Sequence, residues 1–368
     1  MTERLTTLLN READTFEVPA APAADILGVG RRLRRRRTGT IWATAAVAVA
    51  VVAGGSVLVG TRGDDQAVAP AAPPPVQVAW GAGDTVYVGT DGHAAQLPEV
   101  AQTLYYTSAG ILVRTNKDGS SDGGAPFHFQ LVKADGTTSK LDVTLGEVVP
   151  STDPTQPYLA WATMTDGKIQ VVVHDVSTDQ DVATVDVPGA FSWGGWAAPP
   201  VSLAGDQVYV GTDGPTTVVN WRTGEATSST VLPENYFPEV HGGRTVTVSD
   251  RGRQDAHARV VDALTGRTVL DIPIGRTAQV TLSPDGRFAK LGGFLNQKTF
   301  QVYDVDTGSK VTITGSSFDR GWTFDDGLFT VRRDQLTVCS ATTGDCESST
   351  VPAPAGADVR YAGDIYES

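Results

Sequence analysis

Five histidines are the residues of this chain best suited to metal binding or proton transfer, and they are far apart: His93, His128, His174, His241 and His257. Zinc and general-base sites often show short spacings such as His-x-His or His-Glu-x-x-His, which aim both side chains at one point. Neither spacing occurs, and there is no phosphate-binding loop or EF-hand loop. We therefore predict no catalytic residues, no metal site and no cofactor, and a protein that is not an enzyme.

The two cysteines, Cys339 and Cys346, flank the segment SATTGD. A hairpin that turns at this segment would place them opposite each other on adjacent strands. The alternative is a redox-active or metal-binding pair, which usually has Cys-x-x-Cys spacing or a histidine nearby. Because the charge pattern described below places this segment outside the cytoplasm, we expect a structural disulfide.

Two loops concentrate aromatic residues that could contact a ligand. Trp193 and Trp196 lie in AFSWGGWAAPP, and Tyr236 and Phe237 lie in NYFPEVHGG. Aromatic rings on exposed loops offer flat contact area to a sugar or a peptide. The same four side chains could instead fill gaps between neighbouring repeats, because large aromatic residues are usually mostly buried. Both interpretations remain open.

From residue 76 onward the chain is a series of short strands. Runs rich in Val, Thr, Ile, Tyr and Phe alternate with Gly, Asp and Asn turns, and no helical periodicity extends over three turns. A unit of strand, polar turn and strand recurs, and VYVGTDG occurs twice. The recurring turns are 36 to 45 residues apart, near Asp135, Thr178, Thr223, Thr265, Thr307 and Thr343.

A period near 40 with several strands per unit is typical of β-propeller blades. SPDGRFAKL and QVYDVDTGSKV resemble WD-type and quinoprotein-like propeller repeats. We predict an all-β fold, a seven-bladed β-propeller over residues 76–368, with six blades as the alternative. The first unit lacks a clear fourth strand, and a strand near VRYAGDIY at the end of the chain could complete it.

Two finer resemblances have limited implications. Ser317, Asp319, Gly321 and Phe324 in SFDRGWTF are similar to the Asp-box of sialidase-like propellers, which implies a structural hairpin turn and no catalytic role. The quinoprotein-like repeats here lack the tryptophan that docks neighbouring blades, and no vicinal cysteine pair is present. That resemblance therefore implies the fold without the cofactor.

The N-terminal part has the pattern of a membrane anchor. Residues 38–61 contain no charged residue and, as a helix, would cross a hydrocarbon core about 30 Å thick. Six arginines precede this span: Arg31, Arg32, Arg34, Arg35, Arg36 and Arg37. This bias predicts an N-terminus in the cytoplasm and an extracellular C-terminal domain. We expect a mostly disordered cytoplasmic tail at 1–37, a transmembrane helix at 38–61 and a Pro/Ala-rich spacer at 62–75; a cleaved signal peptide ending at Ala69 is the alternative.

The net charge of the C-terminal part, which we expect to lie outside the cell, limits its possible partners. Residues 64–368 contain 20 basic and 37 acidic residues, a net charge of −17, which argues against nucleic acid as a ligand. We expect an extracytoplasmic binding module for a protein, peptide or cell-wall glycan. One alternative is a sensor acting through the cytoplasmic tail on a regulator, since the layout resembles single-pass proteins of high-GC Gram-positive bacteria, some of them anti-sigma factors. The other is a glycoside hydrolase or lyase with carboxylates in the propeller funnel.

Overall fold

The computed structural model describes residues 77–120, 124–192, 195–234, 237–249, 252, 255–274, 278–293, 298–352 and 358–363. They belong to one compact unit, Ala71–Ser368. The predicted tail, membrane span and spacer lie outside the described residues. Within the described ranges, no helix has the length and apolar character needed to cross a membrane.

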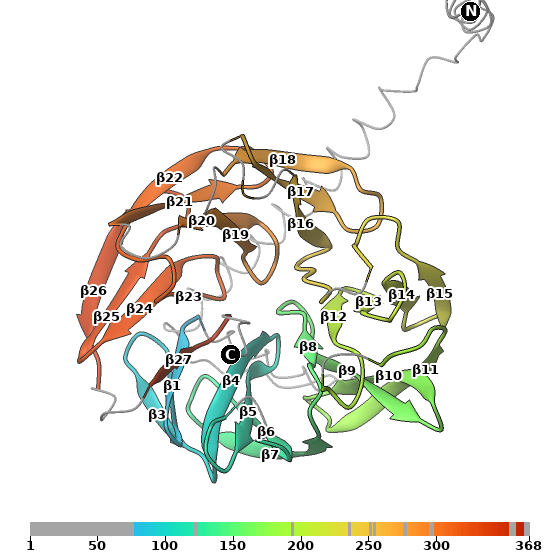
Figure 1. The fold of residues 1–368 in the computed structure, drawn as a ribbon. Helices are drawn as coiled ribbons and strands as arrows, with labels where there is room; N and C mark the ends of the chain where they lie inside the picture. Colours follow the sequence, from blue (N-terminus) through green and yellow to red (C-terminus); the bar gives the residue numbers. More distant parts are fainter. Residues whose placement is uncertain are drawn as a thin grey trace, which may run out of the picture. The chain divides into compact units, whose positions relative to one another are not determined.

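Seven antiparallel sheets are arranged around a common axis (Figure 1). The first blade has the order β27-β1-β2-β3 and contains β1 (Ala79–Ala82), β2 (Thr85–Val88), β3 (His93–Gln96) and β27 (Val359–Tyr361). The second contains β4 (Val100–Thr107), β5 (Gly110–Asn116), β6 (Phe127–Val132) and β7 (Thr138–Leu145). The third contains β8 (Ser151–Thr152), β9 (Tyr158–Thr165), β10 (Lys168–Asp175) and β11 (Gln180–Val187).

The other four blades follow in chain order. The fourth contains β12 (Val201–Ala204), β13 (Gln207–Val210), β14 (Thr217–Asn220) and β15 (Glu225–Ser228). The fifth has three strands, β16 (Arg244–Ser249), β17 (His257–Asp262) and β18 (Thr268–Pro273). The sixth contains β19 (Ala278–Leu282), β20 (Phe288–Gly293), β21 (Thr299–Asp304) and β22 (Lys310–Thr314). The seventh contains β23 (Gly321–Trp322), β24 (Leu328–Arg332), β25 (Gln335–Cys339) and β26 (Cys346–Thr350), so the seven-bladed prediction is confirmed.

Burial follows the position of a strand within its blade. β5 is buried at every residue, whereas the outermost strand β7 alternates between exposed and buried residues. Middle strands are covered on both faces by the adjacent blades, while outer strands also meet solvent. The hydrophobic core therefore lies between blades, and its largest cluster extends from Tyr105 in the second blade to Trp221 in the fourth.

The recurring turn joins the last two strands of a blade through a side-chain cap. Asp262 Oδ1 accepts hydrogen bonds from the backbone N–H groups of Leu264 and Thr265, and Asp304 does the same for Asp306 and Thr307. The next residue is glycine with a positive φ, 71° at Gly266 and 70° at Gly308. Glycine adopts this conformation without steric cost, which explains the repeated Asp-x-x-Thr-Gly pattern.

Two sequence predictions concern how particular strands are joined to each other. Cys339 and Cys346 are paired residues of β25 and β26 and form a disulfide, as predicted. β27 pairs with β1 as the innermost strand of the first blade, so the predicted ring closure by the C-terminal strand is also confirmed.

The two copies of VYVGTDG occupy different strand positions. The first copy is in β2, the third strand of its blade counted from the axis, whereas the second is in β13, the second strand of its blade. The difference arises because β27 adds an inner strand to the first blade. The identical sequence of the two segments therefore reflects a similar hairpin. It does not place them at equivalent strand positions in their blades.

Hydrogen bonds cross every junction between neighbouring blades. In order around the ring, representative donors and acceptors are Tyr106 Oη to Gln77 O, Ser108 N to Gln156 O, Gly205 N to Asp153 Oδ2, Val240 N to Ser202 Oγ, Arg244 Nη1 to Gly286 O, Arg287 Nη1 to Asp326 Oδ2, and Phe324 N to Gln77 O. Their distances are between 2.7 and 3.3 Å. These bonds hold the innermost part of each blade to the next.

The junction between the sixth and seventh blades contains Asp326, a carboxyl group with a raised pKa. Burial and the neighbouring carboxyl group of Asp285 raise the pKa of Asp326 to about 8, although Arg287 Nη1 lies 2.7 Å from Asp326 Oδ2 and opposes the shift. Asp326 thus binds a proton in the folded state between about pH 4 and pH 8 and releases it on unfolding.

Stability should therefore fall as pH rises through this window. The folded state binds more protons than the unfolded state, so the slope of the unfolding free energy is negative, at most about 1.4 kcal/mol per pH unit. We expect Asp326→Asn to flatten this slope in urea unfolding measured at several pH values. Asp319→Asn, at an exposed carboxylate, is the control. Equal slopes in the wild type and Asp326→Asn would contradict the assignment.

Candidate functional site

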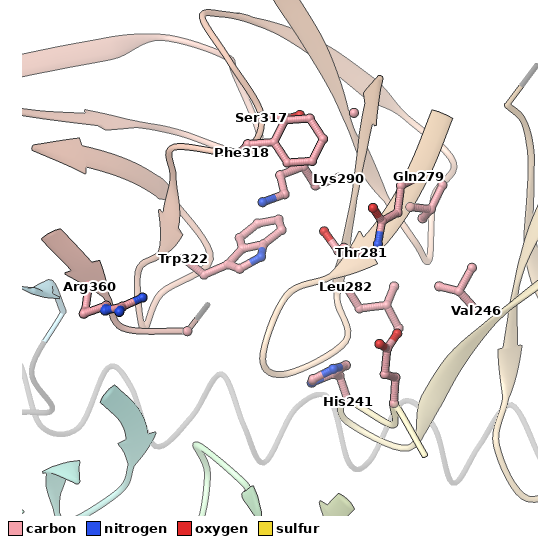
Figure 2. A pocket seen from close by; sticks show the side chains of 14 residues that line it. His241, Val246, Gln279, Thr281, Leu282, Lys290, Ser317, Phe318, Trp322 and Arg360 are labelled. Atoms are coloured by element: carbon pink, nitrogen blue, oxygen red, sulfur yellow. The ribbon is translucent and has the colours of Figure 1, made fainter. Parts of the chain in front are cut away.

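The inner wall of the ring is incomplete on one side. In the fifth blade, the segment before β16 makes only the isolated bridge between His241 and Arg244, so no regular innermost strand is present there. The inner strands β23 and β27 of the seventh and first blades are also short. A cavity of about 370 Å³ lies at this place, lined by residues of the fifth, sixth, seventh and first blades (Figure 2). We call it the axial cavity.

Polar and apolar side chains both line the axial cavity. Lys290 on β20 and Arg360 on β27 are its cationic residues among those described, and Glu239 is its carboxylate. Gln279 and Thr281 on β19 add an amide and a hydroxyl group. Figure 2 shows Lys290, Thr281 and Trp322 extending into the same space. A mostly pre-formed pocket with a few polar groups is typical of small-ligand sites.

Trp322 is held in place by the second blade. Tyr106 donates a hydrogen bond from its hydroxyl group to the backbone oxygen of Trp322 at 2.9 Å. The Tyr106 ring also contacts Phe324 edge-on, with centroids 5.8 Å apart. Burial raises the pKa of Tyr106 far above its usual value, so it remains a neutral donor. The indole of Trp322 is therefore a fixed wall of the cavity.

His241 lies between the axial cavity and a smaller one. The smaller cavity, about 50 Å³, is lined by residues of β4, β8 and β12 and shares His241 and Gly363 with the axial cavity. Burial lowers the pKa of His241 to about 4, and the nearby Asp285 and Asp153 only partly oppose this shift. The imidazole is thus neutral at pH 7 and can donate one hydrogen bond and accept another.

The hydroxyl oxygen of Thr281 is buried and has no hydrogen-bond partner among the described residues. Thr281 lies in the middle of the innermost strand of the sixth blade and lines the axial cavity. Buried hydroxyl groups usually have a partner, and one that lacks a protein partner is commonly satisfied by water or a ligand. Thr281 is therefore a polar anchor point in the wall.

The structure brings together two of the four aromatic residues that were predicted to contact a ligand. The rings of Trp196 and Phe237 are both half-buried and meet edge-on, with centroids 6.2 Å apart. Phe237 also lines the smaller cavity. Trp193 and Tyr236 lie outside the described residues. Ligand contact by these four residues stays a prediction.

The histidines do not converge on one point. His128 lies 2.8 Å from Glu99, His257 Nδ1 lies 2.5 Å from Asp271, and His174 contacts Asp181 at 2.8 Å and Asp179 at 3.0 Å. Nowhere in the described part of the chain do three or more His, Cys, Asp or Glu side chains form a group that could hold a metal ion.

The Asp-box-like segment does not form the hairpin turn that its sequence predicts. Residues 315–320 connect β22 of the sixth blade to β23 of the seventh, so the segment joins two blades and is not a hairpin turn within one. Ser317 is buried against Gly292, where an added Cβ would lie 2.1 Å from the serine Oγ. Asp319 Oδ2 accepts a hydrogen bond from Arg332 at 2.9 Å. The motif thus shapes the wall of the axial cavity.

Sequence reasoning missed the cavity residues on β19, β20 and β27. One signal was present: in AQVTL, Gln279 and Thr281 alternate with Val280 and Leu282. Alternation with a period of two places polar residues on one face of a strand, and on an innermost strand that face can turn toward the axis. The sequence around Lys290 and Arg360 shows no such alternation, because the packing of the blades determines the direction of these two side chains.

Comparisons with known proteins find distant structural likenesses and no match in sequence. No protein-family model matches the chain, and no curated protein matches it in sequence. Apo AztD from Citrobacter koseri is similar to it in structure with a TM-score of 0.47 and 13% identity, over 78% of this chain and 96% of that one. TolB from Acinetobacter baumannii gives a TM-score of 0.41 and 14% identity, over 78% and 66% of the two chains. The Swd1 β-propeller domain from Myceliophteria thermophila gives 0.37 and 13%, over 68% and 97%. At these scores the likenesses carry no functional inference, and the seven-bladed β-propeller assignment rests on the strand order described above.

Proposed function

We propose that this chain is an extracytoplasmic β-propeller that binds a ligand in its axial cavity and performs no chemistry on it. The observation that carries the proposal is the cavity itself, about 370 Å³ in volume and lined by Trp322, Thr281, Lys290 and Arg360 on strands of three blades. Side chains on paired strands are positioned more rigidly than side chains on loops, which favours a pre-formed site.

A hydrolytic role has less support. Glycoside hydrolysis usually needs two carboxyl groups on opposite sides of the scissile bond. Among the described residues that line the axial cavity, Glu239 is the only carboxylate. The described lining therefore offers groups for recognition, and binding is the function it supports best.

A cavity-filling variant tests the proposal. We expect full-length protein to bind members of a peptide and glycan fragment library, followed by ligand-observed NMR, and Thr281→Phe to abolish this binding because the new ring occupies the cavity. Thr227→Phe, on the exposed outer strand β15, is the matched control. Retained binding by a folded Thr281→Phe protein would place the ligand elsewhere. If that variant does not fold, Gln279→Phe replaces it.

The membrane anchor and the orientation of the chain are part of the same proposal. The uncharged segment 38–61 and the arginines that precede it support a single span with the N-terminus in the cytoplasm. A cytoplasmic regulator that contacts residues 1–37 remains the proposed partner on that side. An alkaline phosphatase fused to the C-terminus should be active in a bacterial host, and one fused to the N-terminus should be inactive. The reverse pattern would overturn the orientation.

A further inference from the structure

We propose that the axial cavity is a site for a small organic anion, in which a carboxylate or phosphate group is attached to an apolar or aromatic body. This inference rests on the proposed function and adds the chemical class of the ligand. It follows from the charges of the lining, one buried hydroxyl group and the aromatic wall.

The charge of the cavity is opposite to that of the surrounding domain. Residues 64–368 carry a net charge of −17, yet the described cavity lining contains the cations Lys290 and Arg360 against the single carboxylate Glu239. His241, the remaining titratable side chain, is neutral at pH 7. A cationic recess within low-dielectric walls concentrates anions in it.

Arg360 is placed to bind an anion directly. Its backbone is paired with Gly81 in the inner strand β27, which fixes the start of the side chain. Figure 2 shows the guanidinium group directed toward the cavity. No hydrogen bond or ion pair joins this guanidinium group to another described residue. Guanidinium groups bind carboxylates and phosphates through two parallel hydrogen bonds, which gives both strength and orientation.

Other lining residues supply a polar group and apolar surface. The Thr281 hydroxyl group, which is buried with no hydrogen-bond partner among the described residues, can donate to an oxygen atom of the ligand. Trp322, Leu282 and Val246 offer ring and aliphatic surface in the same cavity. A ligand with an anionic end and a flat apolar body satisfies both kinds of wall.

Three probes that share a phenyl ring test this inference by calorimetric titration of the full-length protein. They are N-acetyl-phenylalanine, its neutral amide, which differs from it only at the carboxyl group, and phenyl phosphate. We expect at least one of the two anions to bind about tenfold or more tightly than the amide, because charge-assisted hydrogen bonds are stronger than neutral ones. The comparison of the two anions distinguishes a carboxylate from a phosphate ligand. Arg360→Gln should remove the preference, and Lys168→Gln, at an exposed position on β10, should retain it.

The outcomes separate this inference from the proposed function. Equal binding of acid and amide, with both lost in Thr281→Phe, would overturn the proposed preference for an anion. The cavity would still be the binding site. A preference that survives in folded Arg360→Gln and Lys290→Gln would place the anion elsewhere and overturn the inference. Absence of binding by all three probes at millimolar concentration would overturn the anion class, while the fragment library still decides whether the cavity binds anything.

Discussion

A chain that ends at Ala357 is expected to lose its cooperative unfolding transition, whereas a chain that ends at Gly363 is expected to keep it. The shorter chain lacks β27, which pairs with β1 at Trp80, Gly81 and Ala82. Without this strand, the inner edge of the first blade is left with unpaired backbone groups.

The contacts of β27 extend to the blades on both sides. The Tyr361 ring meets Phe329 of the seventh blade edge-on at 5.4 Å, and its hydroxyl group lies 3.2 Å from the backbone oxygen of Val331. Gly363 N donates to Leu104 O of the second blade at 3.4 Å. Tyr361 is half-buried, so its side chain contributes less than the about 3–5 kcal/mol of a fully buried aromatic residue, and the backbone pairing of β27 adds to it. Together they are a substantial share of the roughly 5–15 kcal/mol that stabilise a typical domain.

Urea unfolding followed by tryptophan fluorescence and far-ultraviolet circular dichroism measures the effect. We expect a broad or absent transition for the Ala357 chain and a wild-type midpoint for the Gly363 chain. A shared, sharp midpoint in both chains would contradict the closing role of β27.

Gly286→Ala is expected to destabilise the fold by about 2–5 kcal/mol, through two effects that add. Gly286 has a φ of 73°, which costs a non-glycine residue about 1–2 kcal/mol. An added Cβ would also lie 2.2 Å from the backbone oxygen of His241, where the turns of the fifth and sixth blades approach each other. Backbone atoms at such a junction cannot move aside as a flexible side chain can.

Gly205→Ala separates the two effects. Gly205 is in the corresponding turn of the fourth blade with a φ of 59°, but an added Cβ there meets no atom within 4 Å. Only the conformational cost of about 1–2 kcal/mol should therefore appear in its urea unfolding curve. Equal losses in the two variants would show that the close approach between blades contributes nothing.

Local features of the fold could be predicted from the sequence because local chemistry determines them. The Thr-Gly turns follow from side-chain caps and from glycine at positive φ, as at Gly266 and Gly308, and the disulfide follows from a short hairpin. The strand near Tyr361 was identified because the first unit lacked a partner.

Features that depend on how blades meet could not be predicted. The fifth blade has a segment before β16 whose sequence, PEVH, gives no sign that it fails to pair as a strand. The axial cavity is lined by that segment and by strands of three other blades, so its residues Lys290 and Arg360 could not be brought together by spacing alone. The Asp-box-like segment was placed in the wrong kind of turn for the same reason, since it bridges two blades.

The pairing of β27 with β1 also determines when folding can finish. The two strands are about 280 residues apart in sequence, so the last contact of the ring cannot form until nearly the whole chain has been synthesised. Before that moment, β1 presents an unpaired edge to other chains and to proteases. We therefore expect the blades in the middle of the chain to gain protection from hydrogen exchange earlier during refolding than the first blade, which becomes protected last.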